Sequence, residues 1–317
     1  MQRSRPHWKT ESTGLGYRSD NRKVQKTPEN SPDNAPEEIR NTTPVISVII
    51  PVFNREAFIK KAVESVLDQD YGPIECIVVD DGSTDGTPQI LAGFGDGIRV
   101  IQQENSGVSA ARNTGIRAAS GELIAFLDSD DYWLSGKVGA QAAFFKAHPK
   151  ALLCQTNEIW VRNGRRVNPG KRHEKLSGQI FVPSLELCLI SPSAVMMRRK
   201  LFDKIGFFDE TLLACEDYDL WLRVTCKHEV HLIKSAMIVK QGGHKDQLSA
   251  APGLDRYRIT SIDKIMKSGI LSEKQFEAAA AVLARKCRIY AKGCARRGRK
   301  EEAAKCLSIA QTHGIDL

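Results

Sequence analysis

An apolar run that ends in three carboxylates organises this sequence: Gly121-Glu122-Leu123-Ile124-Ala125-Phe126-Leu127-Asp128-Ser129-Asp130-Asp131-Tyr132-Trp133. Residues 123–127 are too few and too uniformly apolar for an amphipathic helix, so they predict a buried strand of a parallel sheet. The acids then follow the carboxyl end of this strand, the edge at which open α/β sheets bind ligands. Asp128 and Asp130 can converge on one hard cation, such as Mg²⁺ or Mn²⁺. The alternative is a solvated acidic turn that caps the next helix.

The composition is that of an ordinary globular protein with an uneven charge. The 317 residues are 41% hydrophobic and 26% charged, with a formal net charge of +8. Residues 251–317 hold 14 Lys and Arg against 7 Asp and Glu. The basic excess therefore belongs to the C-terminal segment and not to the acidic strand end.

The sequence has no apolar segment of the kind that crosses or is exported through a membrane. No window reaches the roughly 18 uncharged apolar residues of a membrane span, and the N-terminus lacks the apolar core of a secretory signal. We therefore expect a cytoplasmic protein. Its eight cysteines form no Cys-x-x-Cys pair, and several lie in apolar runs, so we expect reduced thiols and not disulfides or zinc ligands.

Three segments of different character follow one another. Residues 1–43 are polar and nearly without aliphatic side chains, which predicts a disordered N-terminal extension. Residues 44–250 carry the strand and helix patterns of a folded domain. Residues 251–317 form a basic helical segment, in which Ala-rich helices over 276–297 and 300–313 predict a hairpin. Because one such hairpin cannot fold alone, we expect it to pack on the preceding domain.

Strands and helices alternate through the first part of the domain. Strands are expected over 44–51, 74–79, 98–102 and 123–127, and helical patterns or small-residue helix starts lie between them. This order predicts a doubly wound, mainly parallel sheet whose loops meet at one crevice. The sequence lacks the glycine motifs of dinucleotide sites and of phosphate loops, so neither mode of nucleotide binding is indicated.

Four motifs in this region resemble those of family 2 glycosyltransferases. They are Ser47-Val-Ile-Ile-Pro-Val-Phe-Asn54, Val78-Val-Asp-Asp-Gly-Ser-Thr-Asp85, Asn105-Ser-Gly-Val-Ser-Ala-Ala-Arg-Asn113 and Phe126-Leu-Asp-Ser-Asp-Asp-Tyr-Trp133. Each motif is weak alone, but four in this order and spacing are specific. They cover residues 44–134, and Phe207-Phe-Asp-Glu210 and Cys215-Glu-Asp-Tyr-Asp-Leu-Trp-Leu-Arg223 extend the match to about residue 250.

The resemblance implies an α/β fold of the GT-A type, a nucleotide-sugar-binding fold with a mostly parallel sheet flanked by helices. Residues 44–134 would be the nucleotide-sugar half and residues 135–250 the acceptor half. It further implies a nucleotide-diphosphate-sugar donor, which we expect to be a UDP-sugar, a divalent metal (Mn²⁺ or Mg²⁺) and inversion at the anomeric carbon. The expected activity is hexosyl or N-acetylhexosaminyl transfer to a glycan or lipid-linked acceptor in cell-surface polysaccharide or glycolipid synthesis.

The same resemblance assigns the donor site position by position. The nucleoside pocket would be lined by Pro51, Val52 and Asn54. Asp81 would accept the base N–H, while Arg112 and the backbone around Gly107 would flank the nucleoside and its ribose. The family's Asp-x-Asp motif matches Asp128 and Asp130, and Asp131 is a further metal or ribose contact that the sequence does not rank against them. His244 and Lys245 lie in a loop that often closes over the diphosphate, although simple solvation is the alternative.

Asp217 matches the catalytic base of the family. It follows Glu216 at the start of an expected helix, where a carboxylate is favoured by the helix dipole, so simple capping is the alternative. Inverting transfer needs one carboxylate to take the proton of the acceptor hydroxyl, while metal and cations stabilise the leaving diphosphate.

Other functions fit the sequence less well. A catalytically degenerate nucleotide-sugar-binding or interaction module is the main alternative, but Asp81, Asp130 and Asp217 are all present. A nucleotidyltransferase would need a glycine-rich basic loop after the first strand. A nucleic-acid partner is not expected despite the pI of about 9.0, because the crevice is acidic and no zinc-finger or RNA-binding signature occurs. The basic C-terminal segment could contact the inner membrane face, with a solvated basic face as an equal alternative.

Overall fold

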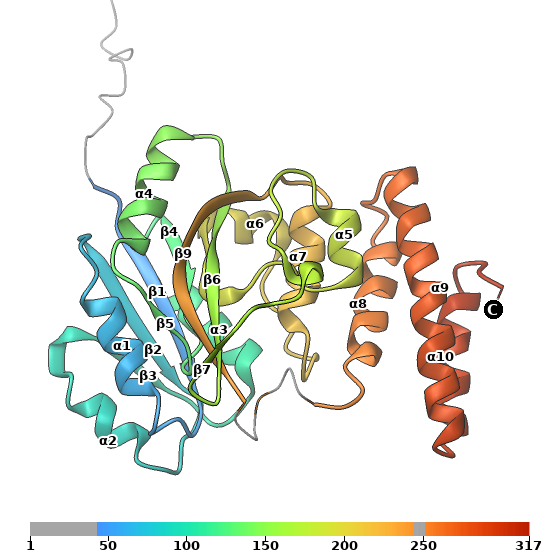
Figure 1. The fold of residues 1–317 in the computed structure, drawn as a ribbon, viewed down its shortest axis with the longest axis horizontal. Helices are drawn as coiled ribbons and strands as arrows, with labels where there is room; N and C mark the ends of the chain where they lie inside the picture. Colours follow the sequence, from blue (N-terminus) through green and yellow to red (C-terminus); the bar gives the residue numbers. More distant parts are fainter. Residues whose placement is uncertain (1–42, 244–246, 248–250, 317) are drawn as a thin grey trace, which may run out of the picture. The chain divides into compact units, whose positions relative to one another are not determined.

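A nine-stranded sheet forms the centre of this computed structural model, which describes residues 43–243, 247 and 251–316 (Figure 1). The strands are β1 (Ile46–Val52), β2 (Ile74–Asp80), β3 (Arg99–Gln102), β4 (Leu123–Phe126), β5 (Tyr132–Trp133), β6 (Leu153–Arg162), β7 (Arg165–Val167), β8 (Val195–Arg198) and β9 (His231–Gly242). Their order is β3-β2-β1-β4-β8-β6-β9-β5, with β7 paired to β6. The extension predicted at 1–43 lies outside the described residues, except for Thr43.

Ten α-helices surround the sheet in the described part of the chain. They are α1 (Ile59–Leu67), α2 (Thr87–Ala92), α3 (Val108–Ala118), α4 (Lys137–Ala147), α5 (Phe181–Glu186), α6 (Phe202–Ile205), α7 (Glu216–Thr225), α8 (Asp255–Lys267), α9 (Glu273–Arg296) and α10 (Lys300–Gln311). Short 3-10 helices are η1 (Gly95–Gly97), η2 (Lys171–His173), η3 (Pro192–Ala194) and η4 (Arg199–Leu201). None of the described helices combines the length and apolar composition needed to cross a membrane.

The two halves of the sheet differ in strand direction. β3, β2, β1 and β4 run parallel, as the alternation of strands and helices predicts. β8 then pairs antiparallel with both β4 and β6, and β5 pairs antiparallel with β9, whereas β6 and β9 are parallel. The mixed half explains why alternation alone does not predict the whole sheet. The pairing of β6 with β9 contains register shifts around Asn157.

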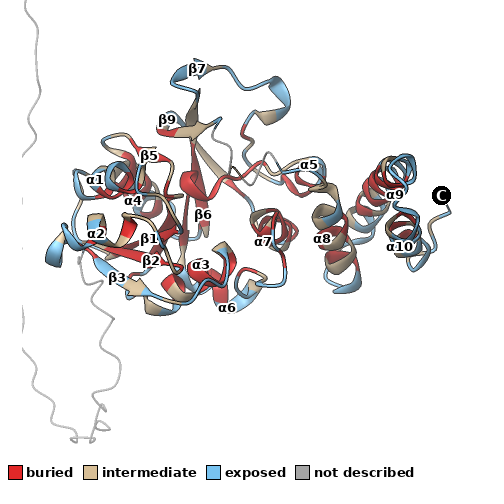
Figure 2. Cartoon of the chain, turned by 90° about the horizontal axis from the view of Figure 1, so that it is seen from below, coloured by how far each residue is buried: buried red, intermediate tan, exposed pale blue. Residues whose placement is uncertain are grey.

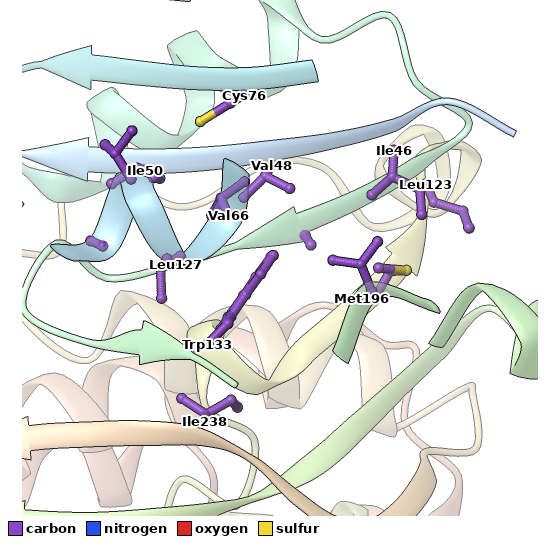
Figure 3. Close-up of a cluster of buried hydrophobic side chains, with 14 of the residues drawn as sticks. Ile46, Val48, Ile50, Val66, Cys76, Leu123, Leu127, Trp133, Met196 and Ile238 are labelled. Atoms are coloured by element: carbon purple, nitrogen blue, oxygen red, sulfur yellow. The ribbon is translucent and has the colours of Figure 1, made fainter. Parts of the chain in front are cut away.

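The sheet is covered on both faces, so its central strands are buried throughout. Every residue of β1 is buried, as in other two-sided parallel sheets. One hydrophobic cluster packs α1 and α4 against the sheet, and Figure 3 shows Trp133 within it, close to Leu127 and Ile238. The other cluster covers the opposite face with α3, α6 and α7. The carboxyl ends of β1, β2 and β4 are thereby held at one edge.

The C-terminal helices share a core with α7 of the preceding domain. Tyr218 and Leu222 of α7 pack in one cluster with buried residues of α8, α9 and α10. A capping box between Ser272 and Gln275 begins α9, and the Gln275 amide also donates to the carbonyl of Cys226 at the end of α7. Figure 2 shows the buried faces of α9 and α10 turned inward and their outer faces exposed. The hairpin is therefore part of the same folded unit as the sheet.

Candidate active site

The loops after β1 and β2 are joined by side-chain hydrogen bonds. The backbone N–H of Asn54 donates to Ser83 Oγ at 2.9 Å, and Asn54 Oδ1 accepts from the N–H of Thr84 at 2.8 Å. Asn54 adopts a left-handed conformation with φ of 50°, which asparagine tolerates better than most residues. Pro51 and Val52 end the buried strand β1 beneath this junction. The three residues predicted to line a nucleoside pocket thus lie together at the sheet edge.

Asp81 organises the loop that leads into α3. Its side chain is buried, and Oδ1 accepts hydrogen bonds from Gln103 Nε2 at 2.7 Å and from the N–H of Ser106 at 2.9 Å. Oδ2 accepts from the N–H of Gly107 at 2.8 Å. Gly107 has φ of 89°, which favours glycine there. The structure therefore brings Asp81 and Gly107 into direct contact.

Arg112, on α3, links the two halves of the domain. Its guanidinium donates from Nη2 to Asp128 Oδ1 at 2.7 Å and from Nη1 to Glu216 Oε1 at 2.6 Å. Only 4% of the Arg112 side chain is exposed, and its guanidinium also lies over the Phe208 ring, 5.2 Å from the centroid. Although burial favours the neutral form, the two carboxylates hold the pKa of Arg112 above its ordinary value. The arginine is therefore a fixed positive charge between the loop after β4 and α7.

The three acids after β4 occupy different environments. Asp131 is buried; its Oδ2 accepts from Ser193 Oγ at 2.7 Å, and its Oδ1 accepts from the N–H of Gln241 at 2.9 Å. Burial raises the pKa of Asp131, and the neighbouring Asp130 and Asp128 raise it further. Asp128 and Asp130 are half-buried. Asp131 thus anchors the acidic loop to β9 and η3, while the other two carboxylates lie nearer the surface.

The acidic loop offers only part of a metal coordination sphere. Among the described residues, no three His, Cys, Asp or Glu side chains gather as a complete metal site. Asp128 and Asp130 supply hard oxygen donors of the type that Mg²⁺ and Mn²⁺ prefer. Such ions are commonly held by one or two carboxylates together with substrate phosphates and water. The donor set therefore fits an ion that is shared with a bound diphosphate.

Glu216 and Asp217 point to different partners at the start of α7. Glu216 is buried in its ion pair with Arg112. Burial raises the pKa of the Glu216 carboxyl, even though the Arg112 guanidinium opposes this shift. Asp217 is half-buried, its Oδ1 accepts from the N–H of Tyr218 at 2.7 Å, and its Oδ2 accepts from the Cys188 thiol at 3.3 Å. Glu216 therefore forms an ion pair with a cation, whereas Asp217 forms none with the residues that the structure describes.

Several residues of this site have no sequence signal that would have identified them. Lys240 of β9 donates from Nζ to Ser191 Oγ at 3.3 Å, and Glu158, Asp131, Asp128 and Asp217 raise the pKa of its ammonium. Ser193 donates to Asp131 and accepts from the N–H of Asp128 at 3.1 Å. These contacts join residues that are far apart in the sequence. The one sequence signal is Lys240 itself, a charged residue that follows the apolar run Met237-Ile238-Val239. His244 and Lys245 lie outside the described residues.

Comparisons of the sequence with known proteins point to one family. The model of "Glycosyl transferase family 2" matches residues 47–206. An uncharacterised glycosyltransferase of Rickettsia typhi is 36% identical over 204 residues, which are 61% of this chain and 64% of that protein. The Escherichia coli protein named UDP-Glc:alpha-D-GlcNAc-diphosphoundecaprenol beta-1,3-glucosyltransferase WfgD is 32% identical over 200 residues, which are 61% of this chain and 75% of that protein.

Solved structures agree on the fold. Residues 1–349 of Staphylococcus aureus TarS superpose with a TM-score of 0.60 at 24% identity, covering 75% of this chain and 69% of that one. The TarS complex with UDP-GlcNAc gives a TM-score of 0.61 at 20% identity, covering 85% and 92%. At these identities the likeness establishes the GT-A fold alone. Because the family model spans half of the sequence and the WfgD match spans three quarters of that relative, this chain belongs to glycosyl transferase family 2.

Proposed function

We propose that this chain is an inverting, divalent-metal-dependent transferase that moves a hexosyl or N-acetylhexosaminyl group from a UDP-sugar to a hydroxyl of a lipid-linked glycan. The observation that carries the proposal is the bridge made by Arg112, which joins the Asp-x-Asp loop at Asp128 to Glu216 beside Asp217. The bridge brings Asp128 to the start of α7, where the proposed base lies. The name of WfgD, with a UDP-sugar and a diphosphoundecaprenol acceptor, supports the choice of substrates.

The donor would bind across the loops that follow β1, β2 and β3. Asn54 and Asp81 would hold the nucleoside, with the backbone at Gly107 beside the ribose. Asp128 and Asp130 would hold Mn²⁺ or Mg²⁺ together with the diphosphate, and the ion would stabilise the charge that develops on the leaving nucleoside diphosphate. His244 and Lys245 remain proposed contacts of the diphosphate, and Asp131 a proposed contact of the metal or ribose, in addition to its structural hydrogen bonds.

Asp217 would act as the general base. The acceptor oxygen attacks the anomeric carbon, its proton passes to the Asp217 carboxylate, and the bond from the anomeric carbon to the diphosphate oxygen breaks. Asp217 suits this role because its neighbour Glu216 is occupied by Arg112. The Lys240 ammonium, whose pKa is raised by nearby acids that include Asp217, adds a positive charge beside the proposed base.

We place the reaction in the cytoplasm, at the inner face of the membrane, in the synthesis of a surface polysaccharide or glycolipid. The outer face of α9 exposes Arg285, Arg288, Lys292 and Arg296 at helical spacing, with Ile289 among them. Cations on such a face attract anionic lipid headgroups. A degenerate binding module is the alternative function, and it would show nucleotide-sugar binding without turnover.

The test is a screen of nucleotide-sugar donors that measures released nucleoside diphosphate, with Mn²⁺ or Mg²⁺ and with excess chelator. We expect release from a UDP-sugar that chelator abolishes. Asp130→Asn should lose activity by orders of magnitude and remain folded, whereas Asp203→Asn, an exposed acid on α6, should not. Full activity in chelator contradicts metal dependence. Donor binding without any turnover, across the donors and with a diphosphate-linked acceptor, favours the degenerate module.

A further inference from the structure

A cleft of about 310 Å³ lies between the start of α8 and the second half of α9, apart from the site described above. Its walls include Leu254 and Arg258 on the α8 side, and Ile289, Gly293 and Arg297 on the α9 side. The cleft thus combines apolar side chains with two guanidinium groups. All of its lining residues belong to the C-terminal helical segment, between Ala251 and Arg297.

The two arginines of the cleft have unused hydrogen-bonding capacity. Arg258 donates from Nη1 to Asp255 Oδ1 at 3.1 Å, but its Nε is buried and has no hydrogen-bond partner in the described residues. Arg297 has no carboxylate partner in that part of the chain either. Its guanidinium folds back over Gly293, where an added Cβ would lie 3.0 Å from Nη2. A buried N–H donor without a partner is costly, and the side chain that carries it also lines the cleft.

The charge balance of the cleft is positive. Asp255 is the one carboxylate among its lining residues, and it is shared between Arg258 and Lys286, whose Nζ lies 3.5 Å from Oδ1. Glu302 accepts a hydrogen bond from the Tyr290 hydroxyl, and its Oε2 lies 3.5 Å from Arg299 Nη1. Neither acid is therefore available to neutralise Arg297. Such a site favours an anion that accepts several hydrogen bonds, such as a phosphate.

The rim of the cleft is apolar. Ile289 is 60% exposed, which is unusual for a large aliphatic side chain on an otherwise charged helix face. Leu254 lines the opposite side. A positively charged pocket with an apolar rim matches a ligand in which a phosphate or diphosphate is joined to a hydrocarbon chain.

The cleft borders the helix that carries the proposed base. The Cys215 thiol, one residue before Glu216, lies 3.9 Å from the carbonyl oxygen of Leu254. α7 and α8 share a hydrophobic core that includes Tyr218 and Ile259. In Figure 1 the chain enters α8 at the lower side of the view, where β9 also ends. The cleft is thus close in the fold to the start of α7, where Glu216 and Asp217 lie.

We propose that this cleft binds the phosphate or diphosphate of a lipid-linked acceptor through Arg258 and Arg297. The inference rests on the proposed function for the identity of the acceptor, but the anion site itself does not depend on turnover. Arg297 is the better residue to change, because it is exposed and lies at the end of α9, whereas Arg258 is also tied to Asp255.

The experiment compares two acceptors that carry the same sugar, one linked to farnesyl diphosphate and one to an uncharged octyl group. Arg297→Gln should raise KM for the diphosphate acceptor about 10- to 100-fold, the usual effect of losing charge-assisted hydrogen bonds. It should leave KM for the octyl acceptor and the rate of donor hydrolysis unchanged. Arg297→Lys should recover part of the loss, and Lys305→Gln, which removes an exposed charge from α10, should have no effect.

A second measurement separates this inference from the proposed function. Calorimetry of the full chain with farnesyl diphosphate should show binding that Arg297→Gln weakens and Lys305→Gln does not, even if no donor is turned over. Inorganic pyrophosphate is the probe for the anion alone; weaker binding than farnesyl diphosphate supports the apolar rim. Equal affinity of wild type and Arg297→Gln for farnesyl diphosphate, or an equal rise in KM for both acceptors, would overturn the proposal.

Discussion

The side chains of Arg112 and Glu216 form a buried ion pair across 104 positions of sequence, with Nη1 and Oε1 2.6 Å apart. Removing one partner leaves the other charge buried and incompletely compensated. Glu216→Gln should therefore lower the free energy of unfolding by about 3 kcal/mol, near the lower end for a broken buried pair. Chemical denaturation measures this free energy.

The control is Glu64→Gln, which breaks an exposed pair with Lys60 at 3.7 Å and should change stability by less than about 1 kcal/mol. Equal stability of the two variants would contradict the role given to Glu216.

Asp217→Asn tests the general base. The substitution is nearly isosteric, and Asn Oδ1 can still accept from the N–H of Tyr218. Turnover should fall by about 10²- to 10⁴-fold, while donor affinity stays within a few-fold, because a base acts in the transition state. Asp219 is unsuitable as a control, since Arg223 and Lys264 bind it. Asp203→Asn is the matched control. A mild effect of Asp217→Asn would assign proton removal to another group.

Asp81→Asn separates two roles of one carboxylate. Its oxygens accept three hydrogen bonds that shape the loop at Ser106 and Gly107, and the same side chain is proposed to hold the nucleoside. Nucleotide affinity, measured by calorimetry, should fall about tenfold or more, and amide exchange at Ser106 and Gly107 should quicken. Asp96→Asn, an exposed acid of η1, should change neither. Faster exchange with unchanged nucleotide affinity would make Asp81 a structural residue only.

Lys137 should make stability depend on pH. Its fully buried ammonium donates to Gln141 Oε1 at 2.6 Å and lies 3.9 Å from the centroid of the Trp133 ring. Burial lowers the pKa of Lys137 to about 7, below its ordinary value in the unfolded chain. Between these two values the unfolded chain binds the extra proton, so stability rises with pH, by about 1.4 kcal/mol per unit from this group.

Lys137→Met removes this contribution. We measure the unfolding free energy of wild type and of Lys137→Met from pH 6 to pH 9. Above about pH 7 the value for the wild type should rise relative to that of the variant. Ionisable groups that do not interact with Lys137 are present in both proteins and cancel in the difference. A constant difference across the range would show that Lys137 keeps its ordinary pKa in the folded protein.

The sequence by itself determined the first half of the fold and the family. Continuous apolar runs at β1, β2 and β4 can be buried on both faces only within a covered parallel sheet, and the acids that follow them must then meet at one edge. This local logic predicts that Asn54, Asp81 and Asp128 lie at that edge, and in the structure they follow β1, β2 and β4, which pair in parallel. It also predicts the helices from α9 onward, because Ala-rich helical periodicity and a short turn act over neighbouring residues.

Tertiary structure alone decided which acids are paired and which are accessible. The sequence does not rank Asp131 against Asp128 and Asp130, and without the family resemblance the start of a helix does not separate Asp217 from Glu216. Pairing with Arg112, Ser193 and the backbone of Gln241 distinguishes them, and these partners come from distant elements. The antiparallel placement of β8 and the position of Lys240 have the same origin. Charge and hydrogen-bond pairing depend on distances in space, which no local pattern of residues encodes.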